Sequence, residues 1–133
     1  MSETEQLINK CSEAAFEVFD SLNIKEELET SEVIRQVAAA FVFGFINAYA
    51  LEQELTPPHV HGIIMSVLVQ KFNYSDQQSV DFAKMLIEAT KKENNPTTNA
   101  IIHYGINSYY QYKANNIDAL ISNFYNVLSK IMG

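Results

Sequence analysis

The sequence predicts an all-α fold, a single-domain bundle of about six helices around a very apolar second helix. Apolar residues recur at the three-and-four spacing of a helix through most of the chain, and alternation with period two is confined to short runs. Helix-capping signals divide the chain into these segments. With 133 residues, 47% of them apolar, the chain (residues 1–133) has the size of one domain.

The first predicted helix has one apolar stripe and one acidic face. The stripe repeats at helical spacing over Leu7, Ile8, Cys11, Ala15, Val18, Phe19 and Leu22. The opposite face carries Glu13, Glu17 and Asp20. Residues 1–32 hold nine acids and two lysines, whereas residues 33–133 hold seven charges of each sign, so the net charge of −7 lies at the N-terminal end.

This acidic segment limits the class of partner. It repels nucleic-acid phosphates and anionic lipids, and it attracts basic proteins and speeds their encounter. We therefore expect no nucleic-acid and no membrane partner, and we expect Glu13, Glu17 and Asp20 to steer a basic partner. A solubilising face without a partner is the alternative.

The second predicted helix runs from about Glu32 to Glu54, after a cap at Thr30 or Ser31. It is apolar on nearly every side over the stretch "VAAAFVFGFINAYAL". That run is interrupted by an asparagine and is shorter than the roughly 20 residues that span a bilayer. A helix that is apolar all round is typical of the centre of a bundle, so we expect it to be buried.

Caps also locate the other four helices. Thr56 followed by Pro57 begins the third helix, which runs to about Phe72, and Ser75 with Gln78 forms a capping box that begins the fourth. The inward-facing residues expected in these two helices are Val60, Ile63, Ile64, Val67, Leu68, Val80, Phe82, Ala83, Leu86, Ile87 and Ala89. A cap followed by proline at 95–96 begins the fifth helix, and the sixth begins near residue 116.

The fifth helix contains "IIHYGINSYYQY", and helical spacing divides this stretch into two faces. The packing face consists of Ile101, Ile102, Gly105, Ile106, Tyr109 and Tyr112, and the glycine allows a neighbouring helix to approach closely. The other face is uncharged and consists of His103, Tyr104, Asn107, Tyr110 and Gln111. Tyrosines without charged neighbours are typical of the centre of a recognition surface, so we expect these five residues to bind a partner, with ordinary surface residues as the alternative.

Catalytic, metal-binding and cofactor-binding motifs do not occur in the sequence. The four glycines are isolated, and neither the serines nor Cys11 have a histidine and an acid at a catalytic spacing. On a helix, His59 and His61 would point about 160° apart, so they share a metal ion only if Pro57 and Pro58 unwind the first turn. We therefore expect no enzyme activity, no metal and no cofactor, with capping or surface roles for the two histidines.

The N-terminus "MSETEQLINKCSE" does not have the basic start and apolar run of a secretion signal. The single cysteine excludes an intrachain disulfide, which favours a reducing compartment. We expect a cytoplasmic protein.

Two stretches, "FNYSDQQSVDFAKMLIEAT" and "NNPTTNAIIHYGINSYYQY", resemble the paired signature of the immunity protein 48 family. The likeness rests on Tyr74-Ser75, Gln78, Pro96, Asn99, Ile102-His103 and Gly105-Ile106. This chain departs from the family where it has Tyr104 in place of a basic residue and Tyr109 or Tyr110 in place of a second histidine. The resemblance therefore carries over no role for a histidine or a basic residue at those positions.

The resemblance implies a small all-helical protein that is encoded beside a bacterial polymorphic toxin and inhibits its cognate toxin by binding. A basic nuclease domain is one candidate toxin, because the acidic first helix would attract it. The alternative from the residues alone is a ligand-binding or regulatory module with an inter-helix pocket near His103. An enzyme would need a histidine close to an acid or a hydroxyl in three dimensions. Homo-oligomerisation is a further alternative, because exposed aromatic patches also serve self-association.

Overall fold

The computed structural model describes residues 2–133, and these residues form six α-helices and one short 3₁₀ helix. Their bounds are α1 Glu3–Leu22, η1 Glu27–Glu29, α2 Glu32–Glu52, α3 Pro57–Phe72, α4 Asp76–Glu88, α5 Pro96–Lys113 and α6 Ile117–Met132. No strand occurs among the described residues. The predicted all-α bundle is confirmed, and each predicted helix is present.

The helices begin at the caps that the sequence predicts. Ser31, rather than Thr30, caps α2, because its side chain accepts a hydrogen bond from the Ile34 N–H at 3.2 Å. The predicted end of this helix at Glu54 is wrong by two residues. Glu54 itself adopts the left-handed conformation, with φ 60°, which ends the helix before it and turns the chain towards α3.

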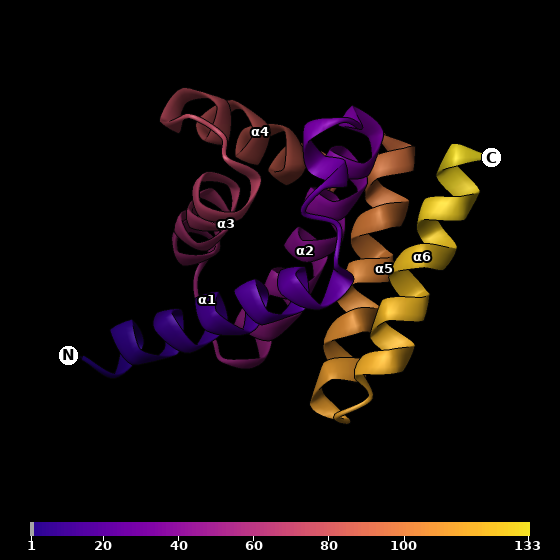
Figure 1. Cartoon of the computed structure of the whole chain (residues 1–133). Helices are drawn as coiled ribbons and strands as arrows, with labels where there is room; N and C mark the ends of the chain where they lie inside the picture. The colour runs from indigo at the N-terminus through magenta and orange to yellow at the C-terminus, as the bar shows by residue number, and fades with distance from the viewer. Residues whose placement is uncertain (1) are drawn as a thin grey trace.

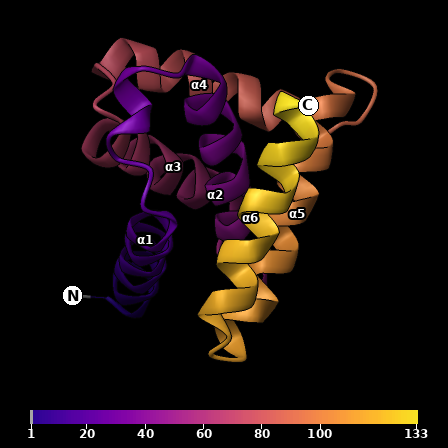
Figure 2. The same cartoon turned by 45° about the vertical axis from the view of Figure 1, so that its right-hand side comes forward.

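α2 lies at the centre of the bundle and contacts α1, α3, α5 and α6 (Figures 1 and 2). All ten residues from Val37 to Ile46 are buried, including the phenylalanines at 41, 43 and 45. By length and composition α2 could also cross a membrane, but 67% of its most apolar window is buried inside the fold. The expected central helix is therefore confirmed by its burial.

The other helices lie on two sides of α2. α5 and α6 form an antiparallel pair on one side, drawn in orange and yellow, whereas α3 and α4 lie on the other side (Figures 1 and 2). α1 packs against both α2 and α3. This division leaves part of the α2 surface uncovered between α5 and the α3–α4 pair.

Two glycines bring α2 and α5 into backbone contact. A Cβ built on Gly105 would lie 2.0 Å from the Phe41 carbonyl oxygen, and a Cβ on Gly44 would lie 2.0 Å from the Ile102 carbonyl oxygen. The sequence predicted a close helix approach at Gly105, and the structure confirms it. This close approach brings aromatic residues of the two helices together, since the Phe45 ring lies 5.8 Å from the Tyr109 ring and 5.2 Å from the Tyr112 ring.

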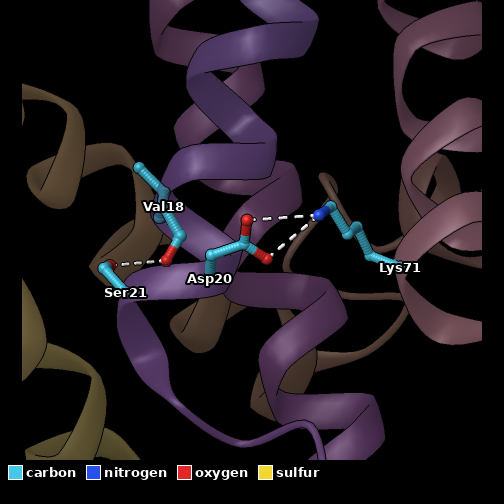
Figure 3. Close-up of polar contacts among 4 residues, drawn as sticks. All are labelled: Val18, Asp20, Ser21 and Lys71. Carbon is cyan, nitrogen blue, oxygen red and sulfur yellow. Dashed lines mark hydrogen bonds and ion pairs between the residues drawn. The ribbon is translucent and has the colours of Figure 1, made fainter.

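α1 closes the bundle with its apolar stripe inward. Cys11 is fully buried, and burial raises the pKa of its thiol to about 12, as expected for a core residue. At the C-terminal end of α1, Asp20 forms an ion pair with Lys71 of α3, with 3.0 Å between carboxylate oxygen and Nζ (Figure 3). The adjacent Ser21 donates its hydroxyl to the Val18 carbonyl oxygen in the same view.

Candidate functional site

The predicted recognition face of α5 is divided by the structure. His103, Asn107 and Tyr110 are exposed, and no other helix covers them. Tyr104 and Gln111 lie at one edge of this face, half-buried against α6. The Tyr104 carbonyl and the Gln111 side chain both accept hydrogen bonds from one asparagine of α6, at 2.9 and 3.3 Å.

The hydroxyl of Tyr104 is also engaged. It accepts a hydrogen bond from Lys130 of α6 at 2.6 Å, and the same ammonium lies 5.1 Å from the centre of the tyrosine ring. Helix α6 therefore uses both Tyr104 and Gln111 in packing, which leaves each of them only partly exposed to a partner. Three residues of the predicted face remain available: His103, Asn107 and Tyr110.

Tyr110 lies at the opposite edge of the face, beside an open groove of about 520 Å³. α2 forms the floor of the groove, α5 forms one wall, and the start of α3 with the end of α4 forms the other. The lining residues are Phe43, Asn47, Ala48, Leu51, Leu55, Pro57, Val60, Ile87, Thr90, Ile106 and Tyr110. The lining is mostly apolar, and the volume is in the range of ligand-binding pockets.

Three large apolar or aromatic side chains of the groove are exposed to solvent. The exposed fractions are 80% for Leu51, 57% for Tyr110 and 40% for Ile87. These residues come from three different helices, α2, α5 and α4, and line the same pocket. A contiguous apolar patch of this kind marks a binding surface more often than scattered single residues do.

A cluster of tyrosines and carboxylates joins α1 to the C-terminal halves of α2 and α5. The rings of Tyr49 and Tyr109 lie 5.4 Å apart, and Phe45 contacts both rings as well as that of Tyr112. The Tyr112 hydroxyl donates to the Glu17 carboxylate at 3.3 Å. We call the set of Tyr49, Tyr109, Tyr112, Glu13, Glu17 and Glu52 the tyrosine–carboxylate cluster.

Burial and the neighbouring carboxylates hold these tyrosines in the neutral form. Burial is the main cause that raises the pKa of Tyr49, Tyr109 and Tyr112. The carboxylate of Glu52 raises the pKa of Tyr109 further, and that of Glu17 does the same for Tyr112. The charge of Glu13 also raises the pKa of Tyr49.

These shifts predict an alkaline loss of stability. Each folded-state pKa lies above the unfolded value of about 10, so the stabilising contribution is complete below that pH. The contribution is lost as the pH rises through the raised values. We expect the melting temperature to fall between about pH 9 and about pH 12. In a Tyr49→Phe, Tyr112→Phe double variant, the melting temperature is expected to fall less over the same pH range. Equal alkaline slopes for the two proteins would contradict this assignment.

The three acids predicted to steer a partner have different environments. All are exposed, but Asp20 is paired with Lys71, whereas Glu17 contacts a neutral hydroxyl and Glu13 lies beside Tyr49. The only ion pairs within residues 2–133 are Asp20–Lys71 and Glu52–Lys113. Glu13 and Glu17 therefore form no ion pair among residues 2–133, and Lys113 lines the same surface pocket as Glu17.

The two histidines of "PHVHG" have different surroundings. His59 accepts a hydrogen bond from the Thr56 N–H through Nδ1 at 3.1 Å, which is the predicted capping role. The buried Nε2 of His61 has no hydrogen-bond partner. In the portion of the chain that the structure describes, no group of three or more histidine, cysteine or acidic side chains could hold a metal ion.

Sequence reasoning missed the groove. Leu51 and Ile87 were assigned to buried faces because each belongs to an apolar pattern, and the pocket near His103 was expected one turn away from its true place. His103 does not line the groove, whereas Ile106 and Tyr110 of the same helix do. One feature of the sequence indicates that Leu51 is exposed. Leu51 is the last residue of the apolar run of α2, where neighbouring helices need not cover it.

Nearly the whole chain matches the sequence model of one known protein family. The sequence model of the family described as immunity protein 48 matches residues 7–132 of the 133 residues. The match therefore includes α2, α5 and the groove between α5 and the α3–α4 pair. Searches of curated proteins and of solved structures find no match to this chain.

Proposed function

Because this chain belongs to the immunity protein 48 family, we propose that it binds a cognate toxin protein and neutralises it without catalysis. The packing of α5 supports this proposal independently of the family. α5 packs on α2 and α6 through most of its surface, yet it leaves His103, Asn107 and Tyr110 uncovered on one side. These three residues are proposed as the centre of the toxin-binding face.

The chemistry of this face suits a protein partner. An imidazole, an amide and a phenol supply hydrogen bonds without a formal charge that would have to be desolvated, and Tyr110 supplies a large contact area. Tyr104 and Gln111 hold α5 on α6 and support the face from behind. The acids Glu13 and Glu17 steer a basic toxin, such as a nuclease domain, towards it. Binding in the cytoplasm of the producing cell completes the proposal.

We expect Tyr110→Ala to weaken the complex with the toxin domain encoded by the adjacent gene by about 30-fold or more. The reason is that Tyr110 is 57% exposed and offers a large aromatic area to a partner, whereas among the aromatic rings of residues 2–133 its ring contacts only that of Tyr109, at 5.4 Å. The measurement is the dissociation constant by calorimetry, after co-purification of the two proteins. Met132→Ala is the matched control, because Met132 is equally exposed, at 57%, but lies at the end of α6. Equal affinities for the two variants would contradict the assignment of this face.

The groove itself favours a second candidate function, binding of a small apolar molecule as a ligand-binding or regulatory module. Its volume of about 520 Å³ and the polar groups of Asn47 and Thr90 among apolar neighbours fit such a ligand. A fluorescent apolar dye tests this candidate. Saturable binding that the toxin domain does not displace would favour a small-molecule site over a protein site.

A further inference from the structure

We propose that a polar pocket between η1, the start of α2 and the turn from α3 to α4 binds the oxyanion group of a small molecule, a carboxylate or a phosphate. The pocket has a volume of about 290 Å³ and is lined by residues of η1, α2, α3 and α4 and of the loops beside them. It shares no lining residue with the groove beside Tyr110, and none of its lining residues belongs to α5. The pocket is therefore separate from the proposed toxin-binding face and goes beyond that function.

Positive side chains gather at this pocket, although the chain as a whole is acidic. Three of the nine lysines and arginines line it. They come from separate segments, since Lys25 precedes η1, Arg35 lies in α2 and Lys71 lies near the end of α3. Like charges around one cavity repel one another, and a bound anion relieves that repulsion.

Arg35 is the only arginine of the chain, and the backbone holds its side chain in place. Its Nε and Nη2 both donate to the Leu28 carbonyl oxygen, with the Nε at 3.0 Å. A guanidinium has five N–H donors, so this carbonyl leaves three of them unused. A planar guanidinium that is already oriented is the side chain best suited to pair with a carboxylate or a phosphate.

The two lysines of the pocket are differently engaged. Lys71 pairs with Asp20 at 3.0 Å, so its charge is compensated (Figure 3). Lys25 is exposed and forms no ion pair within residues 2–133. Glu29 is the one acid among the lining residues, and it forms no ion pair in this part of the chain either. Even with Asp20 included, the pocket keeps one positive charge in excess, which an oxyanion neutralises.

Neutral donors and an apolar base complete the pocket. The Gln78 Oε1 accepts a hydrogen bond from the Ser75 N–H at 2.9 Å, which leaves the NH₂ of this amide without a partner among the described residues. Burial raises the pKa of Tyr74, so its hydroxyl is protonated at neutral pH and able to donate. The buried side chains of Leu28 and Phe72 lower the local dielectric, which strengthens the attraction between the cations and an anion.

Binding is tested on the full-length chain by NMR, with sodium phosphate and sodium succinate as probes and sodium chloride of equal ionic strength as the reference. Because Arg35 is the only arginine, its side-chain Nε–H gives one signal that is identified without mutation. We expect this signal and the backbone N–H signals of residues 71–78 to shift saturably with at least one probe. The two probes distinguish a phosphate site from a carboxylate site. Shifts no larger than those in chloride, with both probes, would overturn the proposal.

Lys25→Glu replaces the unpaired cation without touching the core, because Lys25 is exposed. We expect the affinity for the probe to fall at least tenfold. Lys10→Glu is the matched control, since it makes the same charge change at an exposed lysine of α1 that does not line the pocket. Equal affinities for these two variants would show that the probe responds only to net charge, and the site would be rejected.

Glu29→Gln tests the sign of the charge effect with a side chain of nearly the same shape. Because it removes the one acid of the lining, we expect the probe to bind about threefold more tightly. Glu26→Gln changes an exposed acid that does not line the pocket, and it is expected to leave the affinity close to that of the wild type. Weaker binding by Glu29→Gln, or equal affinities for the two glutamine variants, would contradict an anion in this pocket.

Discussion

Gly105→Ala is expected to destabilise the fold by about 3 kcal/mol or more. The added methyl group would lie 2.0 Å from the Phe41 carbonyl oxygen, so α5 must move away from α2 along the whole contact. A backbone atom cannot yield as the end of a flexible side chain can. The free energy of unfolding in urea measures the loss, and a fall of about 10 °C in melting temperature should accompany it.

Gly62→Ala is the matched control for this substitution. Gly62 lies inside α3, and a Cβ built there meets no atom within 4 Å. Alanine is therefore expected to stabilise the protein by about 0.5–1 kcal/mol, because it reduces the backbone entropy of the unfolded chain. Equal melting temperatures for the two variants would contradict the backbone contact between α2 and α5.

Phe45→Ala is expected to cost about 3–5 kcal/mol of stability. Phe45 is fully buried, and its ring lies 5.2 to 6.1 Å from the rings of Tyr49, Tyr109 and Tyr112. Removing the ring creates a cavity and also loses these edge contacts. Chemical unfolding measures the effect.

Phe45→Leu separates the cost of the cavity from the cost of losing the aromatic contacts. It keeps most of the side-chain volume but removes the aromatic contacts, so we expect a loss of about 1–2 kcal/mol. A cost below about 1 kcal/mol for the alanine variant would show that the three tyrosines do not pack on Phe45. The tyrosine–carboxylate cluster would then lack the support on which its position depends.

Much of this fold follows from local signals in the sequence. Ser31 and Ser75 each cap a helix where the sequence places the cap, because a hydroxyl at that position accepts a hydrogen bond from an N–H that the helix leaves free. α3 likewise begins after Thr56, whose N–H donates to His59. The central position of α2 follows from its apolar residues on every side. Gly105 was identified as a close-approach residue from its place on the packing face of α5.

The composition of the site could be predicted only in part. Tyr104 and Tyr110 differ by six positions and share a predicted face, yet α6 covers one and leaves the other open. Which edge of a helix a neighbour covers depends on the crossing of the helices, and periodicity in one helix does not contain that information. For the same reason, Leu51 and Ile87 follow apolar patterns but lie at the rim of a groove.

Hydrogen exchange of the chain with and without the toxin domain tests the proposed binding surface most directly. We expect slower exchange on complex formation over most of α5 and around the start of α3, at residues 101–113 and 53–60, which include lining residues of the groove. The η1 segment and the start of α2 should exchange at unchanged rates. Protection confined to these control segments, or none at any segment while the toxin remains bound, would contradict a toxin-binding surface at α5 and the groove.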